Sequence, residues 1–199
     1  MSERYDLPDG AVLELFDSWL TREEADRAEV ALRTEVRWEQ GTIRMFGREV
    51  REPRLSAWVG DSESGYTYSG RALVPAPWTE TTAALRDRAA ETSAAPFNSV
   101  LLNRYRDGSD AMGFHADDEP ELGNDPVIAS VSLGATRKLV LRHKKDKTVS
   151  LSLPLVHGSL LVMRGTTQRF YRHAIPRVAA AGERINLTFR HIRARSTQG

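Results

Sequence analysis

The segment VSLSLPL at residues 149–155 decides the fold class of this 199-residue chain. Its valine and leucines alternate with two serines and a proline. Successive side chains of an extended strand point to opposite faces, so this alternation is typical of a β-strand with one buried face. The segment therefore predicts a half-buried strand in a sheet.

More short strands are expected on both sides of this segment, separated by Gly, Pro, Asp and Asn residues that favour turns. They are residues 97–105, 127–133, 138–143, 159–163 and 184–191. Two short amphipathic helices are expected earlier, at about 21–35 and about 79–92, the first opened by a capping box of Thr21 and Glu24. No helix separates the later strands, which disfavours a parallel βαβ fold. This order predicts a mainly β protein with flanking helices (α+β), a β-sandwich or jelly roll with helices on one sheet.

Length and composition limit the class of protein further. We expect residues 1–199 to form a single domain, with residues 1–10 as a loose tail and residues 193–199 as another. The chain is 40% hydrophobic and 28% charged, the balance of a soluble globular protein. It has no cysteine, which excludes disulfides, thiolate metal sites and cysteine nucleophiles. The sequence shows no signal peptide or transmembrane run, so we expect a cytoplasmic protein with no membrane partner.

The net charge of +1 hides an uneven distribution of charged residues. Residues 107–125 include seven acidic side chains and no Lys or Arg, whereas residues 137–147 include six basic side chains against one Asp. Residues 164–195 include eight Arg against one Glu. Such a distribution is compatible with binding both a metal ion and a polyanion, and solvated surface faces are the alternative.

His115 and Asp117 have the spacing of two metal ligands on one extended segment. Residues i and i+2 point to the same side, so the imidazole and the carboxylate converge. His173 lies 58 residues downstream and is the candidate third ligand. Two histidines and one carboxylate form the facial triad of non-haem Fe(II) oxygenases. A hydrogen-bonded His–Asp pair at the surface is the alternative.

The strand at residues 184–191 is apolar on one face and polar on the other. Its polar face carries Arg184, Asn186 and Arg190. Asn103 and Tyr105 place an amide and a phenol on one face of an earlier strand in the same way. Arginine captures carboxylates through paired hydrogen bonds, so the two strands predict a site for a dicarboxylate cosubstrate. A polar face turned to solvent is the alternative.

In these stretches the chain resembles the AlkB family of Fe(II)/2-oxoglutarate-dependent dioxygenases. The resemblance is carried, in order, by FNSVLLNRYRDG (97–108), GFHADDE (113–119), IASVSLG (128–134), LVHGSLL (155–161), YRH (171–173) and RINLTFR (184–190). It covers about residues 95–192 and continues more weakly back to about residue 43. The branch that repairs double-stranded DNA is the most similar, through residues 53–54, 60–61, 66–70 and 142–144.

The resemblance implies a double-stranded β-helix, or jelly roll, at about 96–192, preceded by helices and a nucleotide-recognition lid within about 1–95. It implies that His115, Asp117 and His173 bind Fe(II) as the catalytic centre. The implied 2-oxoglutarate ligands are Asn103, Tyr105, Arg184, Asn186 and Arg190, with Arg184 on the distal carboxylate and Arg190 at the end near the metal.

The implied reaction is direct reversal of DNA damage. N-alkylated bases such as 1-methyladenine and 3-methylcytosine would be demethylated oxidatively with O₂ and 2-oxoglutarate, releasing formaldehyde, succinate and CO₂. The protein supplies position and excludes water. A monomer acting on DNA, single- or double-stranded, is expected, with RNA as a further partner.

Aromatic and acidic residues are the candidates for holding the damaged base. A base inside a duplex must be flipped out, and Trp58, Tyr66 and Tyr68 are the candidate stacking partners. Asp118 and Glu119, beside the metal ligands, would favour the positive charge of these lesions. Core packing is the alternative for the three aromatic residues. Ordinary core positions are expected for Trp19, Trp38 and Trp78.

Phe46 lies in RMFGR, residues 44–48, a segment with the composition of an exposed turn. It is expected to wedge between base pairs, and inward packing is the alternative. Basic residues of the segment 142–147, Arg142 and Lys144 among them, are expected to contact phosphates. The remaining histidines have no carboxylate partner in register and are expected to be structural or surface residues. They are His143, His157 and His191.

A different substrate for the same metal chemistry is the nearest competing interpretation. A 2-oxoglutarate oxygenase acting on RNA, protein or a small molecule would keep the triad without needing Phe46 or the basic segment. An inactive binding module is disfavoured because the triad and both arginines of residues 184–190 are present.

Overall fold

The computed structural model describes residues 2–45, 48–62, 66–68, 71–73 and 75–193. Its helices are α1 (Arg22–Glu35), α2 (Glu80–Ser93) and α3 (Thr167–Phe170), with 3₁₀ turns η1 (Pro8–Gly10) and η2 (Pro120–Leu122). Its strands are β1 (Glu3–Leu7), β2 (Ala11–Phe16), β3 (Thr42–Met45), β4 (Arg48–Arg51), β5 (Leu55–Gly60), β6 (Tyr66–Tyr68), β7 (Arg71–Leu73), β8 (Ser99–Tyr105), β9 (Met112–His115), β10 (Ile128–Gly134), β11 (Arg137–His143), β12 (Ser150–Leu155), β13 (Ser159–Gly165), β14 (Tyr171–Ile175) and β15 (Arg184–Arg190). None of the described helices is both long and apolar enough to cross a lipid bilayer.

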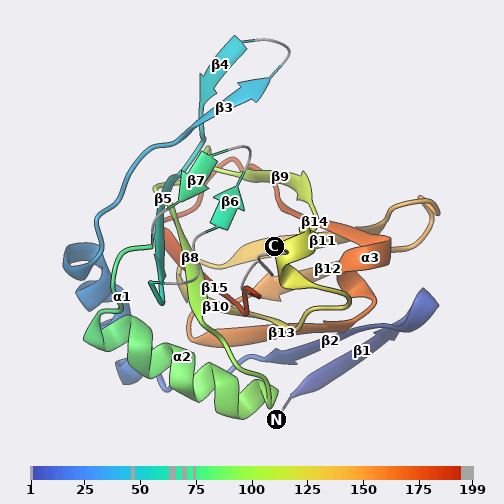
Figure 1. Ribbon diagram of the computed structural model, residues 1–199, viewed down its shortest axis with the longest axis horizontal. Helices are drawn as coiled ribbons and strands as arrows, with labels where there is room; N and C mark the ends of the chain where they lie inside the picture. Colours follow the sequence, from blue (N-terminus) through green and yellow to red (C-terminus); the bar gives the residue numbers. More distant parts are fainter. Residues whose placement is uncertain (1, 46–47, 63–65, 69–70, 74, 194–199) are drawn as a thin grey trace, which may run out of the picture.

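Two antiparallel sheets and a pair of helices make three layers (Figure 1). The larger sheet has the order β1-β2-β13-β10-β15-β8-β5, and the smaller has the order β12-β11-β14-β9. Helices α1 and α2 bury one apolar cluster against the larger sheet, and a second cluster fills the space between the sheets. The predicted jelly roll with helices on one sheet is confirmed.

Ser150–Leu155 of the alternating segment form β12, an edge strand of the smaller sheet. Leu153 and Leu155 are buried between the sheets, whereas Ser150 and Ser152 are exposed. Pro154 is tolerated because an edge strand has one side on which no neighbouring strand needs a hydrogen bond.

Both helices begin as the sequence predicts. The Glu24 backbone N–H donates to Thr21 Oγ1 at 3.2 Å, and the Thr21 backbone N–H donates to Glu24 Oε2 at 2.8 Å. Thr79 and Thr82 make the matching box on α2. Trp19 is buried in the cluster beneath these helices, and Trp38 and Trp78 pack against it while partly buried, as expected.

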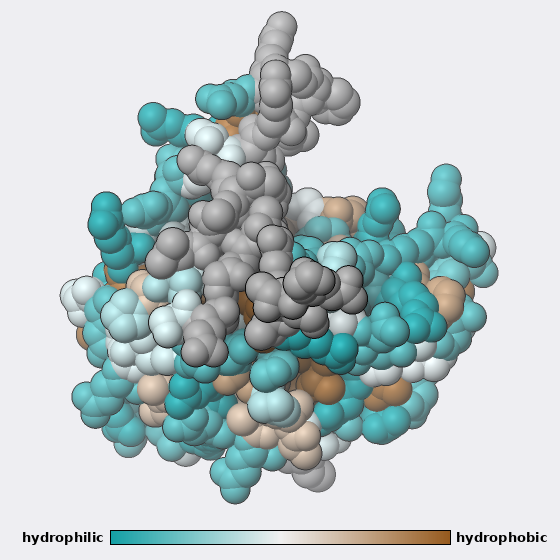
Figure 2. Space-filling model, viewed as in Figure 1, coloured by the Kyte–Doolittle hydropathy of each residue, from teal (hydrophilic) through white to brown (hydrophobic). Residues whose placement is uncertain are grey.

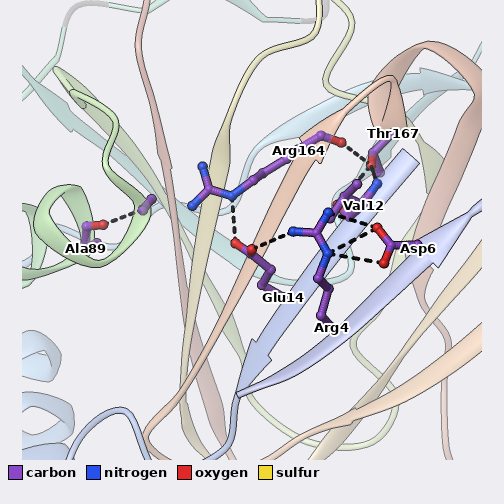
Figure 3. Close-up of polar contacts among 8 residues, drawn as sticks. Arg4, Asp6, Val12, Glu14, Ala89, Arg164 and Thr167 are labelled. Carbon is purple, nitrogen blue, oxygen red and sulfur yellow. Dashed lines mark hydrogen bonds and ion pairs between the residues drawn. The ribbon is translucent and has the colours of Figure 1, made fainter. Parts of the chain in front are cut away.

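The expectation of a loose tail at residues 1–10 was wrong. Residues Glu3–Leu7 form β1, which pairs with β2 and extends the larger sheet. Arg4 contacts Asp6 at 2.9 Å and Glu14 at 3.2 Å, and Arg164 reaches Glu14 at 2.6 Å (Figure 3). Exposed ion pairs contribute little, so burial of the apolar face of β2, which includes Leu13, holds this hairpin.

The segment between α1 and α2, residues 36–79, is here called the lid segment. Its strands β3 and β4 pair as a hairpin that projects from the sheets, and β6 pairs with β7 (Figure 1). Strand β5 instead joins the larger sheet beside β8. The larger sheet therefore draws β1, β2 and β5 from the first 95 residues.

The surface is mostly hydrophilic in the view of Figure 2, with hydrophobic residues scattered over it. In the part of the chain with described side chains, the exposed large hydrophobic residues are Val30, Val50, Phe114 and Val178. Of these, Phe114 adjoins a predicted metal ligand, and its contacts are described with the site.

Candidate metal and cosubstrate site

His115, Asp117 and His173 converge where β9 ends. His115 is the last residue of β9 and lies directly opposite His173 of β14 in the antiparallel register. The ring centroids of the two histidines are 4.3 Å apart. One ligand atom from each of the three residues lies within 4.8 Å of the other two. The strand pairing thus brings together residues that are far apart in the sequence.

The three side chains fit a divalent metal ion. Asp117 Oδ2 and His173 Nδ1 are buried and have no hydrogen-bond partner among the described residues. His115 Nδ1 lies 2.9 Å from the Gly113 carbonyl oxygen, which orients the ring so that Nε2 is the ligand atom. A buried carboxylate oxygen without a donor is costly unless a cation satisfies it. Two imidazoles and one carboxylate suit Fe(II) and leave open positions for cosubstrates.

Asp117 remains ionised although it is fully buried. Burial by itself would raise the pKa of Asp117, but Arg190, His173 and His115 outweigh it and hold the pKa at about 2. Arg190 Nη2 donates to Asp117 Oδ1 at 2.6 Å. The Asp117 backbone N–H donates to Gln168 Oε1 at 2.9 Å, which fixes the backbone of this ligand.

His173 is neutral, the form that binds a metal ion. Burial, together with His115 and Arg190, lowers the pKa of His173 to about 3 against the opposing effect of Asp117. The site therefore combines one negative ligand with neutral imidazole at His173.

A cavity between the two sheets adjoins the triad. Its lining includes all of the predicted 2-oxoglutarate ligands: Asn103, Tyr105, Arg184, Asn186 and Arg190. Strands β8 and β15 are neighbours, and their register sets Arg184 opposite Tyr105 and Asn186 opposite Asn103. None of the five is more than 6% exposed. A solvent-facing polar side on these strands is therefore excluded, because the smaller sheet covers it.

Arg184 is a buried cation without an acidic partner among the described residues. Its Nη2 donates to Ser132 Oγ at 2.9 Å, while Nε and Nη1 have no hydrogen-bond partner among the described residues. Burial lowers the pKa of Arg184, as expected for a charge removed from water. Buried guanidinium donors without partners are costly, and an anion would satisfy them. A carboxylate matches their geometry.

The two asparagines have different surroundings. Asn186 Nδ2 donates to Ser130 Oγ at 2.8 Å and to the Val131 carbonyl at 2.9 Å, so the protein itself holds this group. Asn103 Oδ1 accepts from Arg54 Nε at 2.7 Å. Because this bond uses Oδ1, the Nδ2 group of Asn103 is available to donate to a ligand in the cavity. Sequence patterns missed this role of Arg54, because its partner lies 49 residues away on β8.

Two predicted substrate-binding residues of opposite charge contact each other. Lys144 Nζ lies 2.8 Å from Asp118 Oδ2 and donates to the Gln168 carbonyl at 2.9 Å. Arg142 instead stacks on Phe114, with its Cζ 4.6 Å from the ring centroid. Phe114 is 42% exposed, and the prediction passed over it although it directly precedes a metal ligand.

The remaining substrate candidates are only partly described. Trp58 is buried and packs with Leu101 and Leu122, which is the core packing named as the alternative to base stacking. Glu119 is half-buried, and its Oε2 has no hydrogen-bond partner among the described residues. Phe46 lies outside the described residues, and so do the side chains of Tyr66 and Tyr68 in β6.

Two of the other histidines have carboxylate partners outside their local register. His143 Nε2 lies 3.0 Å from Asp9 and His157 Nε2 lies 3.1 Å from Asp26, contacts that local register does not reveal. His191 is exposed, as expected.

Asp26, Glu29 and His157 form a second cluster of potential metal ligands. The Gly134 backbone N–H donates to His157 Nδ1 at 2.7 Å, so Nε2 carries the ring proton, and it lies 3.1 Å from Asp26 Oδ1. Metal binding at Nε2 would leave the ring with no proton at all. The cluster is therefore a polar contact between α1 and the loop before β13.

Comparisons with known proteins agree with this geometry. The model of the 2OG-Fe(II) oxygenase superfamily matches residues 12–190. The DNA oxidative demethylase ALKBH2 of Mus musculus is 42% identical over 180 residues, covering 85% of this chain and 75% of that protein. The alpha-ketoglutarate-dependent dioxygenase alkB homolog 3 of Homo sapiens is 38% identical over 188 residues, covering 89% and 65% respectively.

A solved structure shows the same fold. OsALKBH1 matches with a TM-score of 0.63 at 18% identity, covering 95% of this chain and 100% of that one. The matched superfamily and the triad together indicate an enzyme that uses Fe(II), O₂ and 2-oxoglutarate. The chain belongs to the AlkB family within the 2OG-Fe(II) oxygenase superfamily.

Proposed function

We propose that this enzyme oxidatively removes N-linked alkyl groups, such as those of 1-methyladenine and 3-methylcytosine, from bases in DNA. The observation that carries the proposal is the buried triad of His115, Asp117 and His173 beside a cavity lined by the unpaired cation Arg184. The activity named for the DNA oxidative demethylase ALKBH2 of Mus musculus supplies the substrate class.

The chain's own residues would hold the reactants. Fe(II) held by the triad, together with O₂ and 2-oxoglutarate, supplies the oxidising power that hydroxylates the N-methyl carbon. Arg184 binds the distal carboxylate of the cosubstrate, and Arg190 keeps Asp117 ionised and oriented. Apolar side chains of the cavity wall, such as Leu139 and Leu161, exclude water from this end.

The damaged base has to leave the duplex to reach the metal. We assign Tyr66 and Tyr68 of the lid segment to stacking on the flipped base, and Phe46 to filling the gap that it leaves. Trp58 is instead buried against Leu101 and Leu122, so it packs in the core of the protein. Glu119 supports recognition of a cationic lesion, because its buried Oε2 has no other partner among the described residues. After hydroxylation, the ring nitrogen keeps the C–N bonding electrons and the carbon leaves as formaldehyde.

Phosphate contacts would come from Arg142 and the exposed lysines of the β11–β12 loop, Lys145 and Lys147. Lys144 contributes differently, since it already holds Asp118 beside the metal ligands. A monomer suffices in this proposal, because the triad and the cavity lining come from one chain.

Formaldehyde release from a methylated oligonucleotide tests the proposal. Single-stranded DNA, duplex DNA and RNA carrying 1-methyladenine or 3-methylcytosine would be incubated with Fe(II), ascorbate and 2-oxoglutarate, and each cofactor omitted in turn. Release that requires all components and favours DNA is expected. Succinate formation without formaldehyde from any oligonucleotide would contradict a nucleic-acid substrate and favour a protein or small molecule.

A further inference from the structure

Arg137, the first residue of β11, is almost completely buried. Its Nη1 donates to the Asp107 carbonyl at 3.2 Å, and its Nη2 donates to the carbonyls of Asp110 at 2.9 Å and Pro176 at 2.6 Å. All three acceptors are main-chain oxygens. The guanidinium is thus held firmly by two loops, but none of its hydrogen bonds goes to a carboxylate.

The two carboxylates closest in sequence to these contacts have other partners. Asp110 accepts from Arg106 Nε at 2.8 Å, and Asp107 accepts from the Ser109 hydroxyl at 2.6 Å. Arg137 Nε has no hydrogen-bond partner among the described residues. The positive charge of Arg137 is therefore only partly compensated by the protein around it.

Arg137 and Arg184 both lie over the ring of Tyr105. The Cζ atoms are 5.5 Å and 5.2 Å from the ring centroid, respectively. Burial lowers the pKa of each arginine, and the charge of Arg137 lowers the pKa of Arg184 further. Two buried like charges are thus held around one aromatic ring, an arrangement that an anion would stabilise.

The cavity offers the place for that anion. Tyr105 and Arg184 line it, whereas Arg137 lies behind them and does not. Arg137 can therefore act on a bound carboxylate only through the position of the Tyr105 ring and through its own charge.

We propose that Arg137 is a positioning residue for 2-oxoglutarate, which holds Tyr105 beside Arg184 and adds a second positive charge that favours an oxo acid with a distal carboxylate. The proposal rests on the cosubstrate placement proposed above. It predicts that Arg137 contributes to the choice of a dicarboxylic over a monocarboxylic oxo acid, a property that a purely structural residue would not affect.

Binding measurements without turnover test this inference. The apoprotein would be loaded with Mn²⁺ in place of Fe(II). It would then be titrated by calorimetry with 2-oxoglutarate and with 2-oxopentanoate, which has the same carbon chain without the distal carboxylate. The variants are Arg137→Gln, which removes the charge, and Arg137→Lys, which keeps it. Ser109→Ala is the matched control, because it removes a hydrogen bond to Asp107 in the same loop without changing any charge.

We expect Arg137→Gln to weaken 2-oxoglutarate binding about tenfold and 2-oxopentanoate binding less than about twofold. Arg137→Lys should keep most of the preference for 2-oxoglutarate. Ser109→Ala should leave that preference unchanged, because both buried cations and the carboxylates near them remain. Should Arg137→Gln fail to fold, Arg137→Met offers the same comparison without burying a new polar group.

Equal weakening of both acids by Arg137→Gln, or a loss of preference in Arg137→Lys as large as in the Gln variant, would overturn the proposal. Both results would make Arg137 a loop contact only. Failure of the cosubstrate placement itself has a different signature. In that case Arg184→Gln would leave the preference for 2-oxoglutarate unchanged.

Discussion

Arg190 and Asp117 form a buried ion pair that joins the two sheets at the centre of the site. Arg190 belongs to β15 of the larger sheet, and its Nη2 lies 2.6 Å from Oδ1 of Asp117, two residues after β9 of the smaller sheet. The pair occupies one oxygen of this candidate metal ligand and leaves Oδ2 without a hydrogen-bond partner among the described residues. A central strand of one sheet thus orients a ligand carried by the other.

Replacing either Asp117 or His115 should abolish activity, but the two variants should differ in stability. Asp117→Ala leaves the Arg190 charge buried without its carboxylate, which should lower the free energy of unfolding by about 3–5 kcal/mol. His115 is only half-buried, so His115→Ala should cost about 1 kcal/mol or less. Urea unfolding and iron titration of both variants check this. Equal stability of the two would contradict the importance of the Arg190–Asp117 pair.

Gln168 should affect metal binding without contacting the metal. Gln168→Leu leaves the buried backbone N–H of Asp117 without its acceptor, at a cost of about 1–3 kcal/mol in stability. Loosening a ligand in this way should reduce metal affinity by roughly tenfold or more. Gln168→Glu keeps an acceptor oxygen and is the control. The role of Gln168 in orienting Asp117 would be refuted if the Gln168→Leu variant bound Mn²⁺ with the affinity of the native enzyme.

Arg184→Lys should raise the 2-oxoglutarate requirement strongly. Lysine keeps the charge but cannot form paired hydrogen bonds to a carboxylate. A loss of about 1.5–3 kcal/mol corresponds to roughly a ten- to hundredfold higher KM for 2-oxoglutarate. Steady-state kinetics at varied cosubstrate and saturating oligonucleotide measure this, with the KM for the oligonucleotide as the internal control. An unchanged requirement would count against Arg184 as the carboxylate partner.

Phe46→Ala should impair repair of duplex DNA more than repair of single strands. Only a duplex leaves a gap that a wedge has to fill when a base is flipped out. Val50→Ala is the matched control, because Val50 is an exposed apolar residue of β4 that lies close to Phe46 in the sequence. The ratio of duplex to single-strand rates should fall for Phe46→Ala alone. Equal losses on both substrates would indicate that Phe46 packs inward.

Acid should remove the stabilisation that Asp110 provides. The hydrogen bonds from Arg106 hold the pKa of Asp110 below its ordinary value of 3.8, against the effect of burial. The unfolded chain therefore binds the proton first, so the stabilisation is complete above about pH 3.8 and disappears as the pH falls below that value. Native protein and Asp110→Asn should differ in urea unfolding at pH 6 and converge below pH 3.8. A constant difference in unfolding free energy across this pH range would exclude the Asp110 charge as the cause of the stabilisation.

Local periodicity determined much of the fold and of the metal site. Alternation at residues 149–155 and 184–191 predicted strands because side chains of an extended chain change face at every residue. The same geometry predicted that His115 and Asp117 converge. The alternation of side chains also indicated a feature that the prediction did not use. Arg137 shares a face with Leu139 and Leu141, and all three are buried. The predicted strand began at residue 138, and Arg137 was interpreted only as part of the basic run at residues 137–147.

Only the tertiary structure decided which distant residues become partners. Arg54 meets Asn103, Lys144 meets Asp118, and Arg190 meets Asp117, although 26 to 73 residues separate the members of each pair. The N-terminal residues join the larger sheet because β2 pairs with the edge of β13, and β1 then pairs with the edge of β2. Periodicity is set by the geometry of neighbouring residues, so a sequence displays it directly. Contacts across the sheets depend on how whole strands pack, and that packing becomes visible only in the folded chain.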